Sequence, residues 1–194
     1  MITFVGAGPG DPDLITIKGR KALEKADIII YAGSLVSPEH LAHAKEGCEI
    51  YNSAKMHLDE VLDVMVEGHR AGKEIVRLHT GDPSIYGAIQ EQMDPLEKLG
   101  IEFEVIPGVS SFVAAAAAIK KEFTLPNVSQ TVILTRVKGR TGVPESENLE
   151  SLAAHGASMA LFLSVGHIEK VIESLIKGYG RDDVPVAVVY RATW

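Results

Sequence analysis

Short apolar runs alternate with segments of helical periodicity along the first half of the chain. Isoleucine, leucine, valine and aromatic residues gather in runs that predict strands at 2–5, 27–31, 49–51, 74–78 and 102–106. Between the third and fourth runs, Leu58, Leu62, Met65 and Val66 recur at helical spacing. Strands that alternate with helices are typical of βαβ units, so we expect a parallel sheet.

A second, shorter series follows Pro126 and Asn127, which break the pattern. It predicts strands at 130–135, 158–163 and 184–190 and a helix over 168–177. The sequence therefore predicts an α/β fold of two α/β domains, with a parallel sheet in residues 1–120 and a mixed sheet in residues 121–194. Because the chain stops at or just past its last predicted strand, we expect the second domain to be incomplete.

Composition narrows the class of protein. The 194 residues are 46% hydrophobic, which is enough for a sizeable core, and the net charge of −7 argues against general nucleic-acid binding. The single cysteine, Cys48, excludes an internal disulfide and a cysteine-based zinc site. No apolar run reaches the roughly 18 residues that cross a bilayer, and the first residues lack a signal-peptide pattern. We expect a cytoplasmic protein that binds neither membranes nor nucleic acid.

A glycine-rich stretch, TFVGAGPGDPDLITIKG at residues 3–19, follows the first predicted strand. It resembles the opening of a dinucleotide-binding fold, whose fingerprint is G-x-G-x-x-G. Gly6 and Gly8 fit that fingerprint, but Asp11 takes the place of the third glycine. A carboxylate there would repel a pyrophosphate, so the stretch predicts a ligand other than NAD.

Gly-Asp-Pro occurs twice, at residues 10–12 and 81–83, each time after a strand. Ligands of open α/β sheets bind at the carboxyl ends of strands, so Asp11 and Asp82 are candidates to face a ligand with positive charge. The alternative is that each aspartate only caps the following helix. A third loop, VIPGVSSF, leaves a strand and opens a helix with Ser110 and Ser111.

Four ordered motifs together resemble the tetrapyrrole methyltransferase family of cobalamin and porphyrin biosynthesis. They are VGAGPGDPDLIT, HTGDPSIYGAIQEQM, VIPGVSSFVAAAAA and QTVILTRVKGRT. The resemblance covers nearly the whole chain, and it implies a two-domain homodimer that binds S-adenosylmethionine between its domains and releases S-adenosylhomocysteine. It also implies that family members continue beyond residue 194, and that cofactor contacts from that segment are missing here.

The resemblance further implies which residues surround the cofactor. The matching positions are Pro9, Thr80, Gly81, Asp82, Ile85, Ser110, Ser111, Val165 and Ala192. Val165 departs from the methionine that is often found at its position in related uroporphyrinogen methylases.

A tetrapyrrole substrate carries several carboxylates, and the acidic chain must meet them with a local basic cluster. Arg136, Lys138 and Arg140 lie in TRVKGRTG, at the carboxyl end of a strand, and are candidate substrate ligands together with Asp11. Each of the three basic residues could instead lie in an ordinary solvated loop.

Methyl transfer from a sulfonium needs no metal, and the catalytic candidates are residues that could accept or relay a ring proton. They are His57, His79 and Asp82. His40 and His43 have the helical spacing of metal ligands, but a surface pair is the interpretation that we favour over zinc. We therefore expect no metal.

Three other functions stay open at this stage. A nicotinamide dehydrogenase is disfavoured by Asp11 and by IIIYAGS, which lacks an acidic residue at the end of the second strand. A related methyltransferase could act at another ring carbon, on diphthamide or on ribosomal RNA. A non-catalytic dimeric scaffold is the third alternative.

Overall fold

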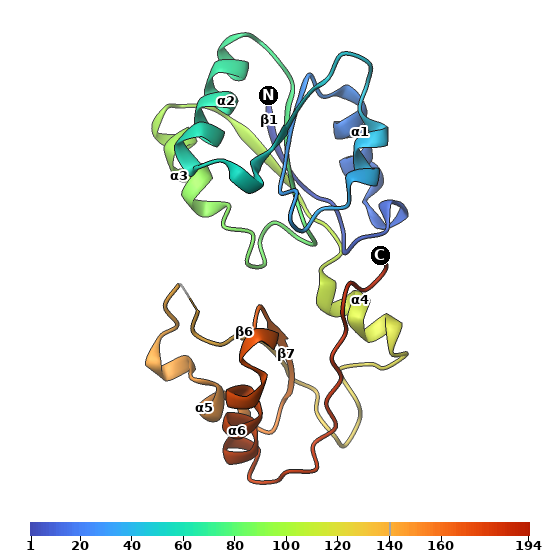
Figure 1. Cartoon of the computed structure of the whole chain (residues 1–194), viewed down its shortest axis with the longest axis vertical. Coiled ribbons are helices and arrows are strands. Elements are labelled where there is room, and N and C mark those ends of the chain that lie inside the picture. Colours follow the sequence, from blue (N-terminus) through green and yellow to red (C-terminus); the bar gives the residue numbers. More distant parts are fainter. Residues whose placement is uncertain (140) are drawn as a thin grey trace. The chain divides into compact units, whose positions relative to one another are not determined.

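The computed structural model describes residues 1–139 and 141–194, which form two compact units (Figure 1). The first unit contains Met1–Ala118 together with Val189–Trp194, and the second contains Ile119–Val188. The sequence assigned the last residues to the second domain, but the side chains of Thr193 and Trp194 hydrogen-bond to the backbone of residues 9–11 in the first unit. The assignment of these residues is therefore corrected.

The described residues of the first unit form a sheet of five parallel strands. In chain order the strands are β1 (Ile2–Gly6), β2 (Ile28–Tyr31), β3 (Glu49–Asn52), β4 (Ile75–His79) and β5 (Phe103–Ile106). They lie in the order β3-β2-β4-β1-β5. The predicted strands and their parallel pairing are confirmed, with each end within one residue of its predicted position.

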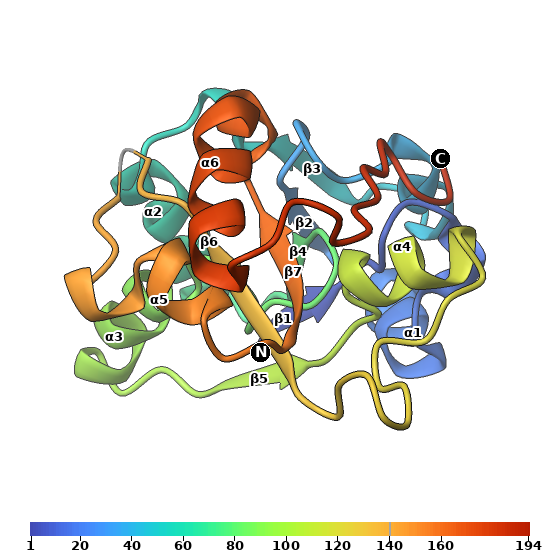
Figure 2. The same ribbon diagram turned by 90° about the horizontal axis from the view of Figure 1, so that it is seen from below.

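Helices cover both faces of this sheet, because successive strand residues point to opposite faces. The helices of this unit are α1 (Ile17–Lys25), α2 (Leu58–Arg70), α3 (Gln90–Lys98) and α4 (Ser111–Ala118). Phe4 faces α2 and α3 and belongs to one buried cluster with Met65 and Leu96. Val5 faces the other way, where it belongs to a second cluster with Leu23 of α1. Figures 1 and 2 show α2 and α3 on one side of the sheet and α1 on the other.

Strand order marks a candidate ligand site at the carboxyl ends of the strands. From β1 the chain crosses toward β2, whereas from β4 it crosses the other way, past β1, to β5. The loops after the neighbouring strands β1 and β4 therefore diverge, and this switch point is where open α/β sheets bind ligands.

The segment 82–89, which follows β4, is not helical. The helix begins at Gln90. Tyr86 and Ala88 have φ angles of 55° and 51°, which lie in the left-handed region and cannot continue a right-handed helix.

The second unit has a smaller sheet, in which the described strands β6 (Val132–Arg136) and β7 (Ser158–Phe162) run parallel. Its helices are α5 (Leu149–Ala153) and α6 (Ile168–Tyr179). The predicted mixed sheet is wrong for the described residues, because 184–190 pairs with neither strand. Val186 and Val188 are each 65% exposed, so this segment lacks the burial that its alternating pattern indicated.

Short 3-10 turns complete the chain. They are Pro12–Leu14, Pro38–His43, Ser53–Lys55, Glu145–Glu147 and Val165–His167. Among residues 1–139 and 141–194, no helix is both long and apolar enough to cross a membrane.

Gly108→Ala tests the close contact of the strand ends. A Cβ at Gly108 would overlap the carbonyl oxygen of Gly81 and lie 2.8 Å from the Cα of Gly6. Because backbone must move to admit it, we expect a loss of about 1–3 kcal/mol in the free energy of unfolding, measured by chemical denaturation. Gly142→Ala is the control, since a Cβ there meets no described atom within 4 Å. Equal stability of the two variants would contradict the tight contact.

Candidate functional site

Three loops meet at the carboxyl ends of β1, β4 and β5, and we call them the β1 loop (7–15), the β4 loop (80–89) and the β5 loop (107–110). They hold six of the seven cofactor candidates of 1–118, namely Pro9, Thr80, Gly81, Asp82, Ile85 and Ser110. The seventh, Ser111, begins α4 directly after the β5 loop. The sequence thus identified the loops that the fold brings to one edge.

The β1 and β4 loops are joined by a pair of backbone hydrogen bonds. The N–H of Gly81 donates to the carbonyl of Gly8 at 2.8 Å, and the N–H of Gly8 donates back at 3.2 Å. Both glycines have positive φ, of 59° and 83°, which glycine adopts without the penalty of a side chain. Ala7 also donates its N–H, to the carbonyl of His79 at 2.8 Å. These amides are occupied within the protein, which supports the expectation that the loop does not cradle a pyrophosphate.

Asp82 joins the β4 loop to the β5 loop. Its Oδ1 accepts the N–H of Ser84 at 2.8 Å, and its Oδ2 accepts the N–H of Gly108 at 2.9 Å. The first bond closes a local turn and caps no helix, because residues 82–89 are not helical, so the helix-capping alternative is wrong for Asp82. The second bond reaches across to another loop. The half-buried carboxylate of Asp82 therefore fixes the separation of the β4 loop from the β5 loop.

The β5 loop lies next to the β4 loop. Ser110 is 7% exposed, whereas Ser111, at the start of α4, is exposed. A Cβ on Gly81 would lie 3.5 Å from the Cα of Ser110, so the turn of the β4 loop is next to this serine. Hydroxyl groups and backbone groups from two strands thus lie side by side.

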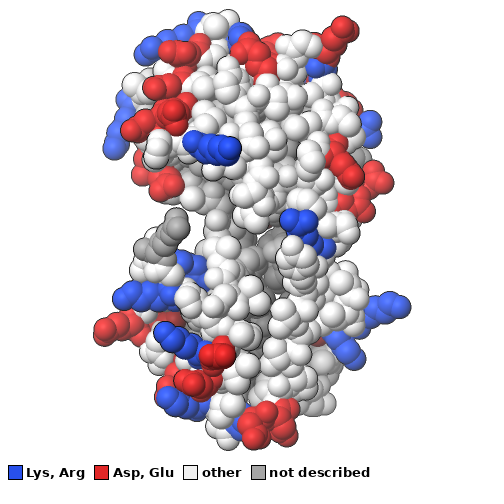
Figure 3. All heavy atoms as spheres, in the orientation of Figure 1, with Lys and Arg blue, Asp and Glu red and all other residues white. Residues whose placement is uncertain are grey.

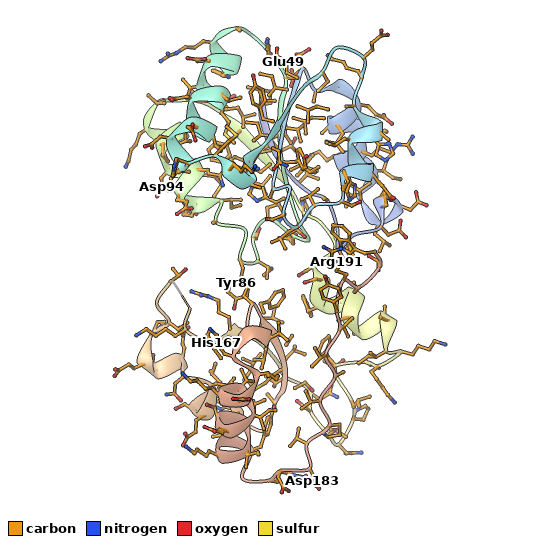
Figure 4. The ribbon with its side chains drawn as sticks, in the orientation of Figure 1. Glu49, Tyr86, Asp94, His167, Asp183 and Arg191 are labelled. Atoms are coloured by element: carbon orange, nitrogen blue, oxygen red, sulfur yellow. The ribbon has the colours of Figure 1, made fainter. Side chains whose placement is uncertain are left out.

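The last residues of the chain lie against the β1 loop. Trp194 Nε1 donates to the carbonyl of Pro9 at 3.0 Å, and the N–H of Asp11 donates to Thr193 Oγ1 at 3.1 Å. The guanidinium of Arg191, labelled in Figure 4, lies 4.9 Å from the centroid of the Trp194 ring. Ala192, the remaining cofactor candidate of this unit, is half-buried between these contacts.

His79 ends β4 as a buried, neutral ring. It is 4% exposed, stacks on Phe4 with 6.1 Å between ring centroids, and its Nε2 has no hydrogen-bond partner among the described atoms. Burial, and secondarily the charge of Arg77, lowers the pKa of His79 to about 3. A ring with this pKa is a weak base at neutral pH, but its unpartnered nitrogen can accept a hydrogen bond.

Two other candidates have local structural contacts. His57 is exposed at the start of α2, where its backbone N–H donates to Glu60 Oε2 at 2.7 Å. It follows β3, which β2 and β4 separate from β1. The Oδ1 of Asp11 accepts the N–H of Asp13 at 2.9 Å and so caps the following 3-10 turn.

The second unit carries the basic candidates. Arg136 ends β6, and its Nη2 donates to the carbonyls of Thr141 at 3.4 Å and Gly142 at 3.1 Å. Lys138 is exposed, and Arg140 lies outside the described residues. Val165 is 67% exposed after β7. Arg136 therefore holds residues 141 and 142 close to the end of β6.

Charge and metal-binding groups add little to this site. Acidic and basic side chains are interspersed over the first unit on the face that Figure 3 shows. Within the described part of the chain, no three His, Cys, Asp or Glu side chains form a group that could hold a metal ion. Of the two histidines with ligand spacing, His40 is fully buried, so the predicted surface pair is wrong for His40, and burial lowers its pKa.

A buried polar pair beneath the β4 loop was missed by the sequence analysis. Arg77 of β4 donates from Nε to Gln92 Oε1 at 3.0 Å and from Nη1 to the carbonyl of Ile30 at 3.3 Å. Burial lowers the pKa of Arg77 to about 10. An arginine within the apolar strand IVRLH was the available signal, because a buried cation needs polar partners.

The buried ring of His79 predicts a loss of stability in mild acid. The unfolded chain binds a proton near the ordinary pKa of 6.5, whereas the folded chain does so only near 3. The contribution of neutral His79 to the free energy of unfolding is therefore complete above pH 6.5. It falls as the pH drops, by up to about 1.4 kcal/mol per pH unit. His79→Gln should flatten the unfolding free energy measured between about pH 6.5 and 4.5, whereas exposed His155→Gln should not. An unchanged slope in His79→Gln would contradict this.

Comparisons with a family profile and with individual proteins all match this chain to tetrapyrrole methylases. The sequence profile of the tetrapyrrole (corrin/porphyrin) methylases matches residues 1–194. The cobalt-precorrin-4 C(11)-methyltransferase of Methanocaldococcus jannaschii is 61% identical over 193 residues, which are 100% of this chain and 74% of that protein. The precorrin-4 C(11)-methyltransferase of Pseudomonas aeruginosa is 47% identical over 193 residues, covering 100% of this chain and 76% of its own.

Solved structures agree with these relatives. A cobalt precorrin-4 methyltransferase of cobalamin biosynthesis has a TM-score of 0.95 and 52% identity over 100% of this chain and 81% of its own. The uroporphyrin-III C-methyl transferase of Thermus thermophilus, complexed with S-adenosyl homocysteine, has a TM-score of 0.75 and 29% identity over 93% of this chain and 73% of its own. The chain belongs to the family of tetrapyrrole (corrin/porphyrin) methylases.

Proposed function

We propose that this chain is an S-adenosylmethionine-dependent methyltransferase that methylates carbon 11 of precorrin-4 or cobalt-precorrin-4 in cobalamin biosynthesis. The observation that carries the proposal is the 61% identity, along 100% of this chain, to a cobalt-precorrin-4 C(11)-methyltransferase. The identity of 47% to a precorrin-4 C(11)-methyltransferase points to the same ring carbon.

The cofactor belongs, in this proposal, at the edge formed by the β1, β4 and β5 loops. The complex of the Thermus thermophilus relative with S-adenosyl homocysteine supports this class of ligand. Thr80 and Ser110 offer hydroxyl groups there, Gly81 has no side chain to occupy the space, and Asp82 holds their two loops together. Ala192 would reach the same ligand from the last residues of the chain, and Val165 from the second unit.

S-adenosylmethionine supplies an activated methyl group on sulfur. The reaction forms a carbon–carbon bond, breaks the sulfur–methyl bond and releases one proton from the substrate. The protein must therefore align the ring carbon with the methyl group and exclude water, and such alignment lowers the barrier by several kcal/mol. These tasks fall to the loop backbones, and they need no charged nucleophile.

The three catalytic candidates differ in how well each could accept the proton that the substrate releases. The pKa of His79, about 3, makes this ring a hydrogen-bond acceptor rather than a base at neutral pH. His57 is exposed on the loop after an edge strand. Asp82 is thus the proposed group nearest the cofactor turn that can accept a proton, although both its oxygens already accept N–H groups.

Substrate carboxylates are proposed to meet Arg136, Lys138 and Arg140, with Asp11 on the β1 loop as a further contact. A guanidinium forms paired hydrogen bonds with a carboxylate, which suits Arg136 at the end of β6. Within the protein, Arg136 Nη2 also donates to the carbonyls of Thr141 and Gly142. Homodimerisation in the cytoplasm completes the proposal and rests on the family resemblance alone.

A transfer assay tests the function. We expect the purified chain to transfer an isotope-labelled methyl group from S-adenosylmethionine to precorrin-4 or its cobalt form, with mass spectrometry for incorporation and NMR for position. Label at another ring carbon would instead indicate a related tetrapyrrole methyltransferase, a class to which a 34% identical uroporphyrinogen-III C-methyltransferase of Bacillus subtilis belongs. Binding of S-adenosylhomocysteine without transfer to either substrate form would contradict the proposal.

Asp82→Ala tests whether the link between the β4 and β5 loops supports cofactor binding. The change removes two acceptors of backbone N–H groups, so the β4 and β5 loops lose their link. A charge-assisted hydrogen bond contributes roughly 1.5–3 kcal/mol, and we expect S-adenosylhomocysteine to bind at least about tenfold more weakly in calorimetry. Asp63→Ala, an exposed aspartate of α2, is the control. A folded Asp82→Ala protein with wild-type affinity would remove Asp82 from the site.

A further inference from the structure

The β4 loop keeps an aromatic residue in a conformation that disfavours it. Tyr86 and Ala88 have φ angles of 55° and 51°, on either side of Gly87. A Cβ at Gly87 would overlap the carbonyl oxygen of Pro83, so the turn is too tight for any other residue there. Glycine or asparagine would occupy the position of Tyr86 with less strain. Strain of this kind persists only where neighbouring structure enforces it, and it gathers at functional sites.

The ring of Tyr86 does not belong to the core of the first unit. It is 44% exposed, and it lies at the tip of the β4 loop, beyond the carboxyl ends of the strands (Figure 4). Burial in that core therefore does not offset the strain. The loop begins with Thr80, Gly81 and Asp82, so the ring follows the proposed cofactor turn by four residues along the chain.

A chain of buried hydrogen bonds holds the far end of this loop. Gln92 Nε2 donates to the carbonyl of Ala88 at 3.0 Å, while Gln92 Oε1 accepts Arg77 Nε at 3.0 Å. Arg77 also donates to the carbonyl of Ile30 in β2. Gln92 is 4% and Arg77 7% exposed, so water does not compete strongly for these bonds. The carbonyl of the strained residue Ala88 is thereby linked, through Gln92 and Arg77, to β2 in the sheet.

The arginine is a costly way to fill the core. Within the described residues, no ion pair joins Arg77 to a carboxylate, and burial lowers its pKa to about 10. Burying a cation with neutral partners alone disfavours folding unless those partners are well placed. An apolar residue would fill the space without this cost but could not fix the orientation of Gln92. The pair thus specifies the loop rather than stabilising the core.

We propose that Tyr86 is a substrate-contacting residue and that Arg77 and Gln92 are positioning residues, which hold the strained β4 loop so that the ring meets the tetrapyrrole. This rests on the proposed function. A tyrosine ring stacks on flat conjugated segments of a macrocycle, and its hydroxyl group can reach a substrate carboxylate. The contact would select the substrate while leaving the cofactor turn unchanged.

Two variants separate contact from positioning. Tyr86→Ala should raise the KM for the tetrapyrrole about tenfold, the size of a lost aromatic contact, with S-adenosylhomocysteine affinity changed less than about twofold. Gln92→Glu keeps an acceptor for Arg77 but loses the donor to Ala88. It should raise the same KM severalfold without lowering Tm. Gln90→Glu, the same charge change on the exposed surface of α3, should leave KM unchanged.

A double variant that combines Tyr86→Ala with Gln92→Glu tests whether Gln92 acts through Tyr86. If Gln92 acts only through Tyr86, then Gln92→Glu should add nothing to the KM of Tyr86→Ala, whereas independent structural effects would add. An unchanged KM in Tyr86→Ala, in a protein whose wild type transfers methyl groups, overturns the proposal and leaves the proposed function standing. Additive effects overturn the positioning role.

Hydrogen exchange reads the loop without any turnover. Amides of residues 84–89 should exchange faster in Gln92→Glu than in the wild type or in Gln90→Glu, because the bond to the Ala88 carbonyl is absent. Unchanged exchange overturns the positioning role. A wild type that transfers no methyl group, but shows the faster exchange in Gln92→Glu, would instead refute the proposed function and retain the positioning of the loop.

Discussion

The close approach of three strand ends is the constraint on which the rest of the first unit depends. Gly6, Gly81 and Gly108 lack side chains where the backbones of β1, the β4 loop and the β5 loop come together. This absence of Cβ atoms permits the paired bonds between Gly8 and Gly81, and it lets the carboxylate of Asp82 reach the amide of Gly108. The three strand ends come this close because no side chain occupies the space between their backbones.

Local patterns identified most of the first unit, for a physical reason. A parallel strand that is buried on both faces reads as a continuous apolar run, and the runs at β1, β2 and β4 are of this kind. The segment 184–190 has a strand-like alternation too, but a strand also needs a free edge to pair with, which no local pattern reports. The same limit explains why the sequence did not foresee Trp194 against Pro9.

The candidate site was predictable where it lies in loops and hidden where it lies in the core. Repeated Gly-Asp-Pro motifs after strands marked the β1 and β4 loops, because strand ends meet at one edge. The bond from Gly108 to Asp82 was not foreseeable, since the two residues are 26 positions apart in sequence. Arg77 and Gln92 appear in sequence as one charge in an apolar strand and one polar residue in a helix. Only their packing shows that they form one unit.

The contact between Trp194 and Pro9 also affects the order of assembly during synthesis. The two residues are separated by 185 positions, and the whole second unit lies between them in sequence. On the ribosome, the strands of the first unit can pair long before its last residues emerge. The β1 loop must therefore wait until residues 193 and 194 have been synthesised to acquire its final hydrogen bonds. A nascent chain that does not yet include them would carry a formed sheet with an unfinished ligand edge.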